Sequence, residues 1–548
     1  MQKKIKNFYH VALTFCLLVG MNILVPNLGG TGINLPYNNW SIILILIVIF
    51  AAQLIAFYEK NIFIPSNFKP FTLFILLFIT PISIFDLEKI IDTSNIAAII
   101  IAGFFISLYQ SGFNKEKLSK TLIYACFIQA IIGIFQAFSP IDTSHSLLFS
   151  NRGVPTGIFL QPNLLASYLA TGLALCIFHY ETYLDKQKSS TLILIFIGLT
   201  LLIVSLLTGS RTGWIAISVI FSCYLFYCRS SHKKIITVSI FILAGLISAN
   251  ILSSISEAIS HKNSHKLSQI TDASITKRLT SYRQSFDMIL ERPISGYGIG
   301  EFQKSYIEFS AKKHYEDKSY PTSFPDFYHP HNEILYWWIE RGILSILALI
   351  YLIIFSTREI LENKINTLLK ISLFIPIAIH AQTEFPLTQS IPHIMILLAM
   401  WFIVDEKPFK KALKIEKNII FLSSLPVLFS IAILGNNIYN TSNLYYFQNF
   451  HRDTKLIKRQ TFLYFPQEYK MNSHIKTIEL QKAIFSSNYG YVREYLDWAA
   501  MDIEDHPDPN AYQHIITASR YLKETELAKT FLTKGKYLFP DFDYKIYF

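Results

Sequence analysis

Thirteen apolar runs constrain this chain more than any other feature of its sequence. A helix crosses a bilayer with about 17–25 such residues. The runs cover residues 8–25, 40–57, 70–85, 95–111, 119–139, 162–183, 190–208, 212–228, 234–254, 332–356, 367–385, 389–404 and 418–435. The chain is 51% hydrophobic, with a mean hydropathy of +0.35. The sequence therefore predicts an all-α, polytopic membrane helix bundle of about 13 transmembrane helices in a lipid bilayer.

The basic residues are distributed as in a membrane protein. The net charge is +11, but Lys and Arg form short clusters between the apolar runs, as at 229–234 and 407–417. Cytoplasmic loops carry such an excess, so we expect no nucleic-acid partner. The same rule places the N-terminus, with Lys3, Lys4 and Lys6 before an uncleaved first helix, in the cytoplasm. An odd number of spans then puts the C-terminal tail on the outer side, which is the periplasm if the membrane is a bacterial inner membrane.

Alternation of apolar and polar stretches predicts four segments. We expect N-terminal transmembrane helices at 1–254, a periplasmic catalytic loop at 255–331, C-terminal transmembrane helices at 332–435 and a periplasmic helical domain at 436–548. Between Pro509 and Pro540, small residues fall near the spacing of the second helix of a tetratricopeptide-type repeat. The tail is therefore expected to be small, α-helical and TPR-like.

A polar loop with two histidines runs directly into an apolar helix at Phe327–Gly342. Imidazole titrates near pH 6.5, so a histidine at the outer surface can accept a proton there. We expect Asn332 to cap the helix and Pro330 to stiffen the approach, which would hold His331 on a rigid element. The alternative is that His329 and His331 are polar residues beside a belt of interfacial aromatic side chains.

Two further polar sites lie at outer helix ends. Gln161 and Asn163 flank Pro162 at a helix start, where their amides either bind a substrate or act as ordinary caps. Arg211 lies in a very tight turn between two apolar helices. An arginine at the membrane interface is costly unless it is paired or reaches water, so it is a functional candidate, with a simple interface anchor as the alternative.

Two charged pairs complete the set. Arg278 and Arg283 lie on a predicted amphipathic surface helix and either bind a diffuse anion such as a pyrophosphate or form a solvated face. His380 and Glu384 are four residues apart in an apolar run and are expected to share one helix face, either stabilising the bundle or shaping a substrate pocket. Glycines at 296–300 favour a backbone turn over a nucleotide-binding loop. No ligand spacing indicates a metal, and we expect no cofactor.

Four motifs in this order carry a family resemblance. They are Gln161-Pro-Asn163, Ser210-Arg-Thr-Gly-Trp214, the run from Arg278 through Pro293 to Gly296-x-Gly298-x-Gly300-x-Phe302, and His331-Asn332 followed by nine residues and Gly342. Together they resemble the O-antigen ligase/polymerase (Wzy/WaaL) superfamily. The His380…Glu384-x-Pro386 segment and the helical tail resemble its bacterial protein O-oligosaccharyltransferases of the PglL/PilO class. The resemblance covers residue 150 or so to the C-terminus.

The resemblance implies a GT-C-like glycosyltransferase that works without a metal. Members of that class transfer an oligosaccharide en bloc from undecaprenyl pyrophosphate to Ser or Thr of a periplasmic protein, often a type IV pilin. In the family, the histidine matching His331 activates the acceptor and the arginine matching Arg211 holds the pyrophosphate. The matches to Gln161 and to the Glu384-Phe-Pro386 segment are also implicated. Phe385 stands where the family has tyrosine, and Ser345 where the ligase pattern has Gly, Thr or Tyr.

We therefore predict a lipid-donor glycosyltransferase that acts at the periplasmic face with inversion at the sugar carbon. His331 and Arg211 are assigned to catalysis. Substrate binding is assigned to Gln161, Asn163, Arg278, Arg283, His329, Asn332, His380 and Glu384. The alternatives are an O-antigen ligase acting on lipid A–core, an O-antigen polymerase, and a transporter or flippase, although the unusual residues cluster at outer helix ends rather than at mid-bilayer. The sequence leaves open whether His329 or His331 is the base.

Overall fold

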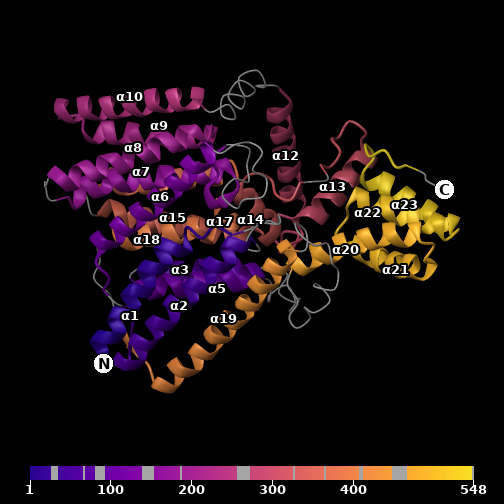
Figure 1. The fold of residues 1–548 in the computed structure, drawn as a ribbon, viewed down its shortest axis with the longest axis horizontal. Coiled ribbons are helices and arrows are strands. Elements are labelled where there is room, and N and C mark those ends of the chain that lie inside the picture. Colours follow the sequence, from indigo (N-terminus) through magenta and orange to yellow (C-terminus); the bar gives the residue numbers. More distant parts are fainter. Residues whose placement is uncertain are drawn as a thin grey trace. The chain divides into compact units, whose positions relative to one another are not determined.

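The protein is almost entirely helical (Figure 1). The structure, a computed structural model, describes residues 1–25, 35–65, 68–79, 93–110, 112–138, 154–184, 188–255, 272–324, 327–362, 366–405, 411–446 and 466–545. Within these residues, seven helices are long and apolar enough to cross a membrane, and five shorter apolar helices accompany them. Each predicted apolar run contains at least part of a helix. The chain is thus an all-α, multi-pass membrane protein, as predicted.

The chain divides into two compact units. Unit 1 comprises Met1–Ile79, Ile91–Thr271 and Leu347–Tyr445, and unit 2 comprises Thr80–Ile90, Asp272–Ile346 and Tyr446–Phe548. Unit 1 contains nearly all of the apolar helices. Unit 2 joins most of the predicted outer loop to the C-terminal tail in one folded body, a long-range association that no local sequence pattern indicates.

In unit 1, helix α7 is the central element of a group of helices that run side by side (Figure 1). The group consists of α6 (Lys115–Ala137), α7 (Pro162–Thr182), α8 (Lys188–Leu207), α9 (Arg211–Tyr227), α10 (His232–Ile255) and α16 (Thr367–Ala381). Helix α7 packs on α6, α8, α9 and α16, while α10 packs on α8. A Cβ atom at Gly213 of α9 would lie only 2.6 Å from the Cβ of Ala166, so the glycine lets α9 approach α7 closely.

The N-terminal helices of unit 1 pack with helices from much later in the chain. The N-terminal elements are α1 (Gln2–Phe15), the π-helical turn η1 (Cys16–Gly20), α2 (Pro36–Glu59), α3 (Phe68–Ile79) and α5 (Thr93–Leu108). The later helices are α15 (Ile343–Glu362), α17 (Pro386–Gln389), α18 (Ile391–Val404) and α19 (Lys417–Tyr446). Strand β1 (Asn61–Ile64) pairs antiparallel with β2 (Lys411–Lys414). The start of α1 lies beside the end of α2, where Lys6 Nζ is 2.8 Å from Glu59 Oε1.

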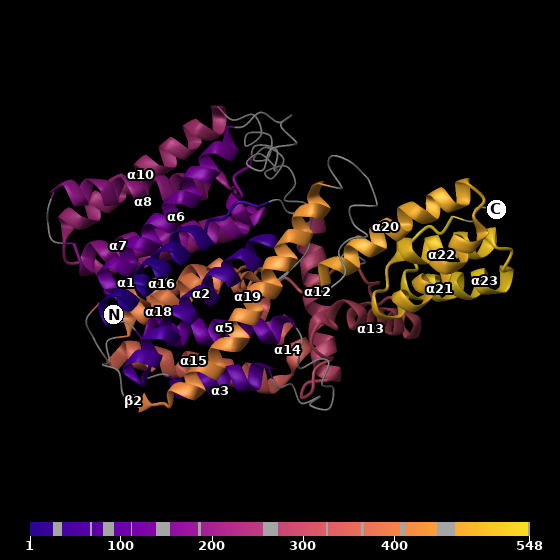
Figure 2. The ribbon, with the colours of Figure 1, turned by 60° about the horizontal axis from the view of Figure 1, so that its bottom comes forward.

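Unit 2 has a separate hydrophobic core formed by the outer loop and the tail. Its helices are α12 (Asp272–Glu291), α13 (Phe302–Glu316), α14 (Glu333–Arg341), α20 (Pro466–Phe485), α21 (Tyr489–Asp505), α22 (Pro509–Tyr521) and α23 (Thr525–Leu538). The tail helices form two hairpins, α20–α21 and α22–α23, and α21, α22 and α23 lie side by side (Figure 2). Helix α13 packs on α23, and Lys304 Nζ of α13 is 3.1 Å from Asp505 Oδ1 of α21.

One predicted apolar run is broken. The run at 332–356 was expected to be a single transmembrane helix, but α14 ends at Arg341 and α15 begins at Ile343. Gly342 between them has φ 75° and ψ −175°, which is outside the helical region and is open only to glycine. The apolar pattern continues across the break, so hydropathy alone did not reveal it.

Candidate functional site

Two buried glutamines of α6 hold the segment that precedes α7. Gln136 Oε1 accepts two backbone N–H groups of that segment at 2.8 and 2.7 Å, and Gln129 Oε1 accepts a third at 3.2 Å. Buried backbone groups need such partners, so the two side chains fix the path of the chain. The segment leads to Gln161, the N-cap of α7, and to Asn163 in its first turn, both of which are partly exposed.

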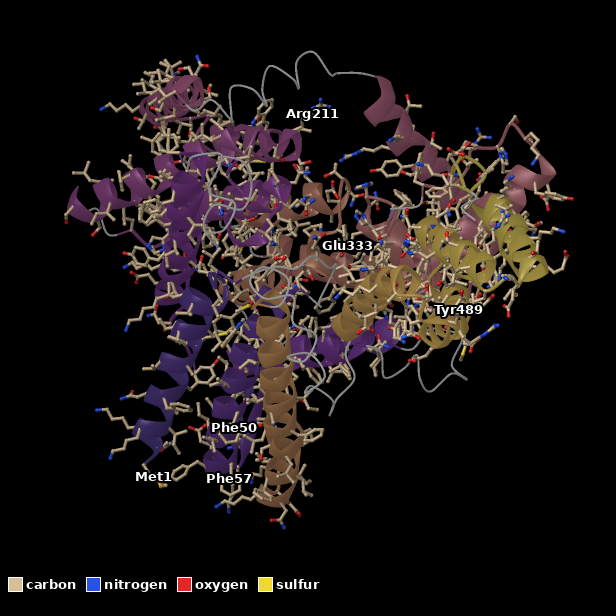
Figure 3. All side chains as sticks on the ribbon, turned by 45° about the vertical axis from the view of Figure 1, so that its right-hand side comes forward. Met1, Phe50, Phe57, Arg211, Glu333 and Tyr489 are labelled. Carbon is tan, nitrogen blue, oxygen red and sulfur yellow. The ribbon has the colours of Figure 1, made fainter. Side chains whose placement is uncertain are left out.

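The turn before α9 presents Arg211 as the first residue of the helix. Ser210 Oγ accepts the N–H of Gly213 at 3.2 Å, and Thr208 Oγ1 accepts the N–H of Ser210 at 3.1 Å. The Arg211 side chain is exposed, and among the residues that the structure describes it has no carboxylate partner. Figure 3 shows Arg211 far from Met1. A guanidinium in this position is available to an anion.

The turn after α16 carries Glu384. Helix α16 ends at Ala381, so Glu384 does not lie on the helix face that it was expected to share with His380; this detail of the prediction is wrong. Its N–H donates to the main-chain oxygen of His380 at 2.9 Å. Thr383 Oγ1 lies 3.0 Å from Thr212 Oγ1, a hydrogen bond that ties this turn to the start of α9. The Glu384 side chain is buried.

A chain of buried hydrogen bonds joins α7, α16 and α18. Ser167 Oγ lies 2.7 Å from His380 Nδ1 and 3.0 Å from His393 Nε2, and His393 Nδ1 lies 2.7 Å from Ser390 Oγ. His380 Nε2 is buried with no hydrogen-bond partner in the described part of the chain. His380 therefore holds α16 against α7. Sequence reasoning did not select Ser167 or His393, although an ionisable residue in an apolar run was a signal for His393.

These contacts bring five of the predicted residues to one end of unit 1. The starts of α7 and α9, with Gln161, Asn163 and Arg211, lie beside the end of α16, with His380 and Glu384. Helix starts carry a partial positive charge, and here a guanidinium adds a full one. Amide and guanidinium donors at such an end suit the oxygens of a phosphate group.

In unit 2, the two histidines form a tight turn at the start of α14. The N–H of His331 donates to His329 Nδ1 at 3.1 Å, and the ring centroids lie 4.4 Å apart. Tyr282 Oη of α12 donates to the main-chain oxygen of His331 at 3.1 Å. His331 has φ 51°, a left-handed conformation that costs an L-residue free energy. Asn332 caps α14 as predicted, because its Oδ1 accepts the N–H groups of Ile334 and Leu335.

His329 is held in its neutral form by its surroundings. Burial, and to a smaller extent the charges of His331 and Arg278, lower the pKa of His329 to about 2. His329 is therefore neutral at physiological pH, and its Nδ1 lone pair accepts the backbone N–H.

The glycine-rich segment after α12 wraps the end of α14. The N–H groups of Tyr297 and Gly298 donate to the main-chain oxygens of Ile339 and Glu340 at 2.7 and 3.1 Å. A Cβ at Gly296 would lie 2.7 Å from the oxygen of Ile339, so only glycine fits. The segment is thus a backbone turn rather than a phosphate-binding loop, and it terminates α14 against α12.

The two arginines of α12 point in different directions. Arg278 is partly buried and contributes to the electrostatic environment of His329, whereas Arg283 is exposed and lies with its guanidinium 5.9 Å from the centre of the Tyr320 ring. Residues five apart are separated by about 140° around a helix. Of the two, Arg278 lies on the side of the histidine turn.

The candidate residues divide evenly between the units. Unit 1 holds Gln161, Asn163, Arg211, His380 and Glu384, and unit 2 holds Arg278, Arg283, His329, His331 and Asn332. Each unit therefore carries one cluster: amide and guanidinium donors at a helix end in unit 1, and two histidines in a turn at the capped start of α14 in unit 2. The sequence did not single out Gln129, Gln136 or Tyr282, which hold these clusters in place.

Two stretches of the chain match family models. Residues 196–350 match a family model described as O-Antigen ligase, and residues 368–547 match one described as Virulence factor membrane-bound polymerase, C-terminal. Among the chain's relatives is a ComP-specific O-oligosaccharyltransferase of Acinetobacter baylyi, 24% identical, and the match covers 70% of this chain and 69% of the relative. A General O-oligosaccharyltransferase of the same organism is 22% identical, and that match covers 63% of this chain and 61% of the relative. An O-antigen ligase of Salmonella typhimurium is 29% identical over 31% of this chain and 40% of its own length.

The all-α fold with apolar, membrane-spanning helices and two polar clusters defines a multi-pass membrane protein with a phosphate-compatible site. The matches make the assignment more specific. Together the matches support placing the chain in the O-antigen ligase/polymerase superfamily. The chain spans from two fifths to about two thirds of the relatives' lengths, so their activities are a basis for proposals rather than assignments.

Proposed function

We propose that the protein transfers an oligosaccharide en bloc from undecaprenyl pyrophosphate to a Ser or Thr hydroxyl of a periplasmic protein such as a pilin. The observation that carries the proposal is the turn at His331. This residue is held through its N–H by His329 and through its oxygen by Tyr282, at the capped start of α14. A base held this rigidly suits proton removal from an acceptor hydroxyl.

The chemistry is a single displacement at the anomeric carbon of the sugar. The acceptor oxygen forms a bond to that carbon while the bond to the pyrophosphate oxygen breaks, and the hydroxyl proton passes to His331. The pyrophosphate leaves as an anion, which needs stabilising charge rather than a proton. We assign that role to Arg211 and the helix starts beside it. Attack opposite the leaving group inverts the configuration of the sugar.

Orientation follows from the basic loops. The cytoplasmic excess of Lys and Arg supports an N-terminus in the cytoplasm of a bacterial cell with this protein in its inner membrane. Figure 3 shows Arg211 far from Met1 and Phe57, which supports an opposite, periplasmic location for Arg211. Unit 2, with its two helical hairpins, is then the periplasmic part, and we assign acceptor recognition to it.

The second candidate is an O-antigen ligase, which would use a lipid A–core sugar as acceptor. The 29% identity to the Salmonella typhimurium O-antigen ligase favours it. That match covers only 31% of this chain, whereas the match to the ComP-specific O-oligosaccharyltransferase covers 70%. The longer match favours a protein acceptor.

Reconstitution tests the proposal directly. The purified protein in liposomes would receive undecaprenyl-pyrophosphate-linked oligosaccharide and either a pilin or a lipid A–core acceptor. We expect intact glycan on a pilin Ser or Thr, detected by mass spectrometry, with inverted anomeric configuration by NMR. Product on lipid A–core alone would establish the ligase, and retained configuration would rule out the single displacement.

A further inference from the structure

An apolar groove of about 570 Å³ lies between α8, α9 and α10 in unit 1. Its walls are the C-terminal half of α8, the N-terminal half of α9 and the C-terminal half of α10. The lining residues are Leu202, Leu206, Leu207, Trp214, Ile217, Ser218, Phe221, Ile242, Leu246, Ala249, Asn250 and Ser253. Helices α8 and α10 are long and apolar enough to cross a membrane, and α9 is a shorter apolar helix packed on α8, so the groove lies at bilayer depth.

The groove has a polar end and an apolar end. Helices α8 and α10 end, and α9 begins, at the polar end, where Asn250 and Ser253 belong to the lining. Deeper in, the wall consists of Leu202, Ile242 and Phe221. Leu202 and Phe221 are almost completely buried, so the depth of the groove is formed by packed side chains.

Arg211 stands at the polar end, one turn before Trp214 of the lining. Its side chain is exposed and has no carboxylate partner among the described residues. Phe221 lies about 15 Å farther along α9, at 1.5 Å per residue. The arrangement therefore matches an amphiphile that has an anionic head beside Arg211 and a single apolar chain directed into the bilayer.

We propose that this groove binds the head-proximal part of the polyprenyl chain of the lipid-linked donor. The inference rests on the proposed function and adds a tail site to the pyrophosphate site at Arg211. The charge of Arg211 selects an anionic lipid, and one continuous groove accommodates one chain, which favours a polyprenyl pyrophosphate over a phospholipid with two acyl chains. Binding the chain here places the pyrophosphate at the starts of α7 and α9.

Photolabelling of the full-length protein tests the proposal without requiring transfer. The probe is a long-chain polyprenyl pyrophosphate with a diazirine in its head-proximal isoprene units, added to the protein in phosphatidylethanolamine liposomes. We expect labelled peptides from α8, α9 and α10 that include groove residues. Unlabelled long-chain polyprenyl pyrophosphate should compete, and phosphatidylglycerol should not.

Bulky substitutions provide matched controls. Ser218→Trp and Leu246→Trp fill the groove, whereas Ile215→Trp and Ile247→Trp place the same side chain on exposed positions of the same helices outside it. A tryptophan in the groove takes the space of several methylene groups of the chain and removes their van der Waals contacts with the helices. We expect the two groove variants to bind the probe at least about tenfold more weakly, and the two controls to bind as the wild type does. A melting curve for each variant identifies any that fails to fold.

The outcomes separate this proposal from the proposed function. Labelling on other helices, equal competition by phosphatidylglycerol, or equal binding by groove and control variants would overturn the groove. Glycan transfer with labelling elsewhere would leave the proposed function intact and remove only the tail site. Labelling in the groove without any transfer product would support the tail site and count against the proposed transfer reaction.

Discussion

His329 provides the sharpest test of how the histidine turn works. If His329 positions His331 through its Nδ1 atom, then His329→Asn should keep the function, because the Asn Oδ1 occupies nearly the same place as Nδ1 and also accepts a hydrogen bond. His329→Ala should lose it. The turn carries a strained left-handed residue at His331, with φ 51°, which costs about 1–2 kcal/mol.

Two hydrogen bonds offset this strain. The N–H of His331 to His329 Nδ1 and the Tyr282 hydroxyl to the His331 oxygen are both 3.1 Å long, and each contributes about 1 kcal/mol. Removal of one bond brings the turn close to balance between its native conformation and others, so we expect His329→Ala to lower kcat by roughly fivefold to tenfold. His329→Asn should remain within about threefold of the wild type.

The assay is initial-rate glycan transfer in liposomes, with acceptor at saturation and the amount of folded protein measured for each variant. Similar rates for Asn and wild type, with a lower rate for Ala, support positioning. Equal and near-complete loss in both variants would contradict a positioning role, because it would make His329 itself the base.

Three other predictions follow from the same structure. Gly342→Ala should lower the free energy of unfolding by at least about 2 kcal/mol, because φ is 75° and the new Cβ would clash with the backbone of Ile294. The control Gly300→Ala has a similar φ of 77° but open space around it, so it should cost only about 1 kcal/mol. Equal melting temperatures for the two variants would contradict this prediction. Arg211→Gln should reduce kcat/KM for the lipid donor by at least about tenfold, and Arg211→Lys should reduce it less because Lys retains the positive charge. Since Arg211 is exposed, neither change should alter the melting temperature. The pKa of His329 is about 2 in the folded protein and about 6.5 in the unfolded chain, so its contribution to stability is complete above pH 6.5 and falls by about 1.4 kcal/mol for each pH unit below it. The melting temperature of the wild type should therefore fall more between pH 7 and pH 5 than that of His329→Asn. Equal falls would show that this histidine is not held neutral.

Hydropathy predicted the all-α membrane fold because a bilayer imposes one length and one polarity on every spanning helix. It did not predict the break at Gly342. That break depends on the backbone of Ile294, which is remote in sequence, and the apolar pattern continues through it. The association of the loop with the tail is also long-range, through contacts such as Lys304 with Asp505, and leaves no local pattern.

The candidate site shows the same division. Asn332 as the cap of α14 was predictable, because capping depends on residues two and three positions away. The hydrogen bond of Tyr282 and the lowered pKa of His329 were not, since the first comes from another helix and the second from burial. Glu384 was placed on a helix that ends three residues earlier, at Ala381.

The most direct test of His331 as the base is transfer of glycan to a co-expressed pilin in a host that makes a lipid-linked oligosaccharide. Wild type and His331→Ala would be compared at equal membrane levels, with intact glycopeptides detected by mass spectrometry. We predict a glycosylated Ser or Thr with the wild type and none with His331→Ala. Equal glycosylation by the two proteins would contradict the role of His331 as the base, and absence of pilin product together with labelled lipopolysaccharide would contradict the protein acceptor.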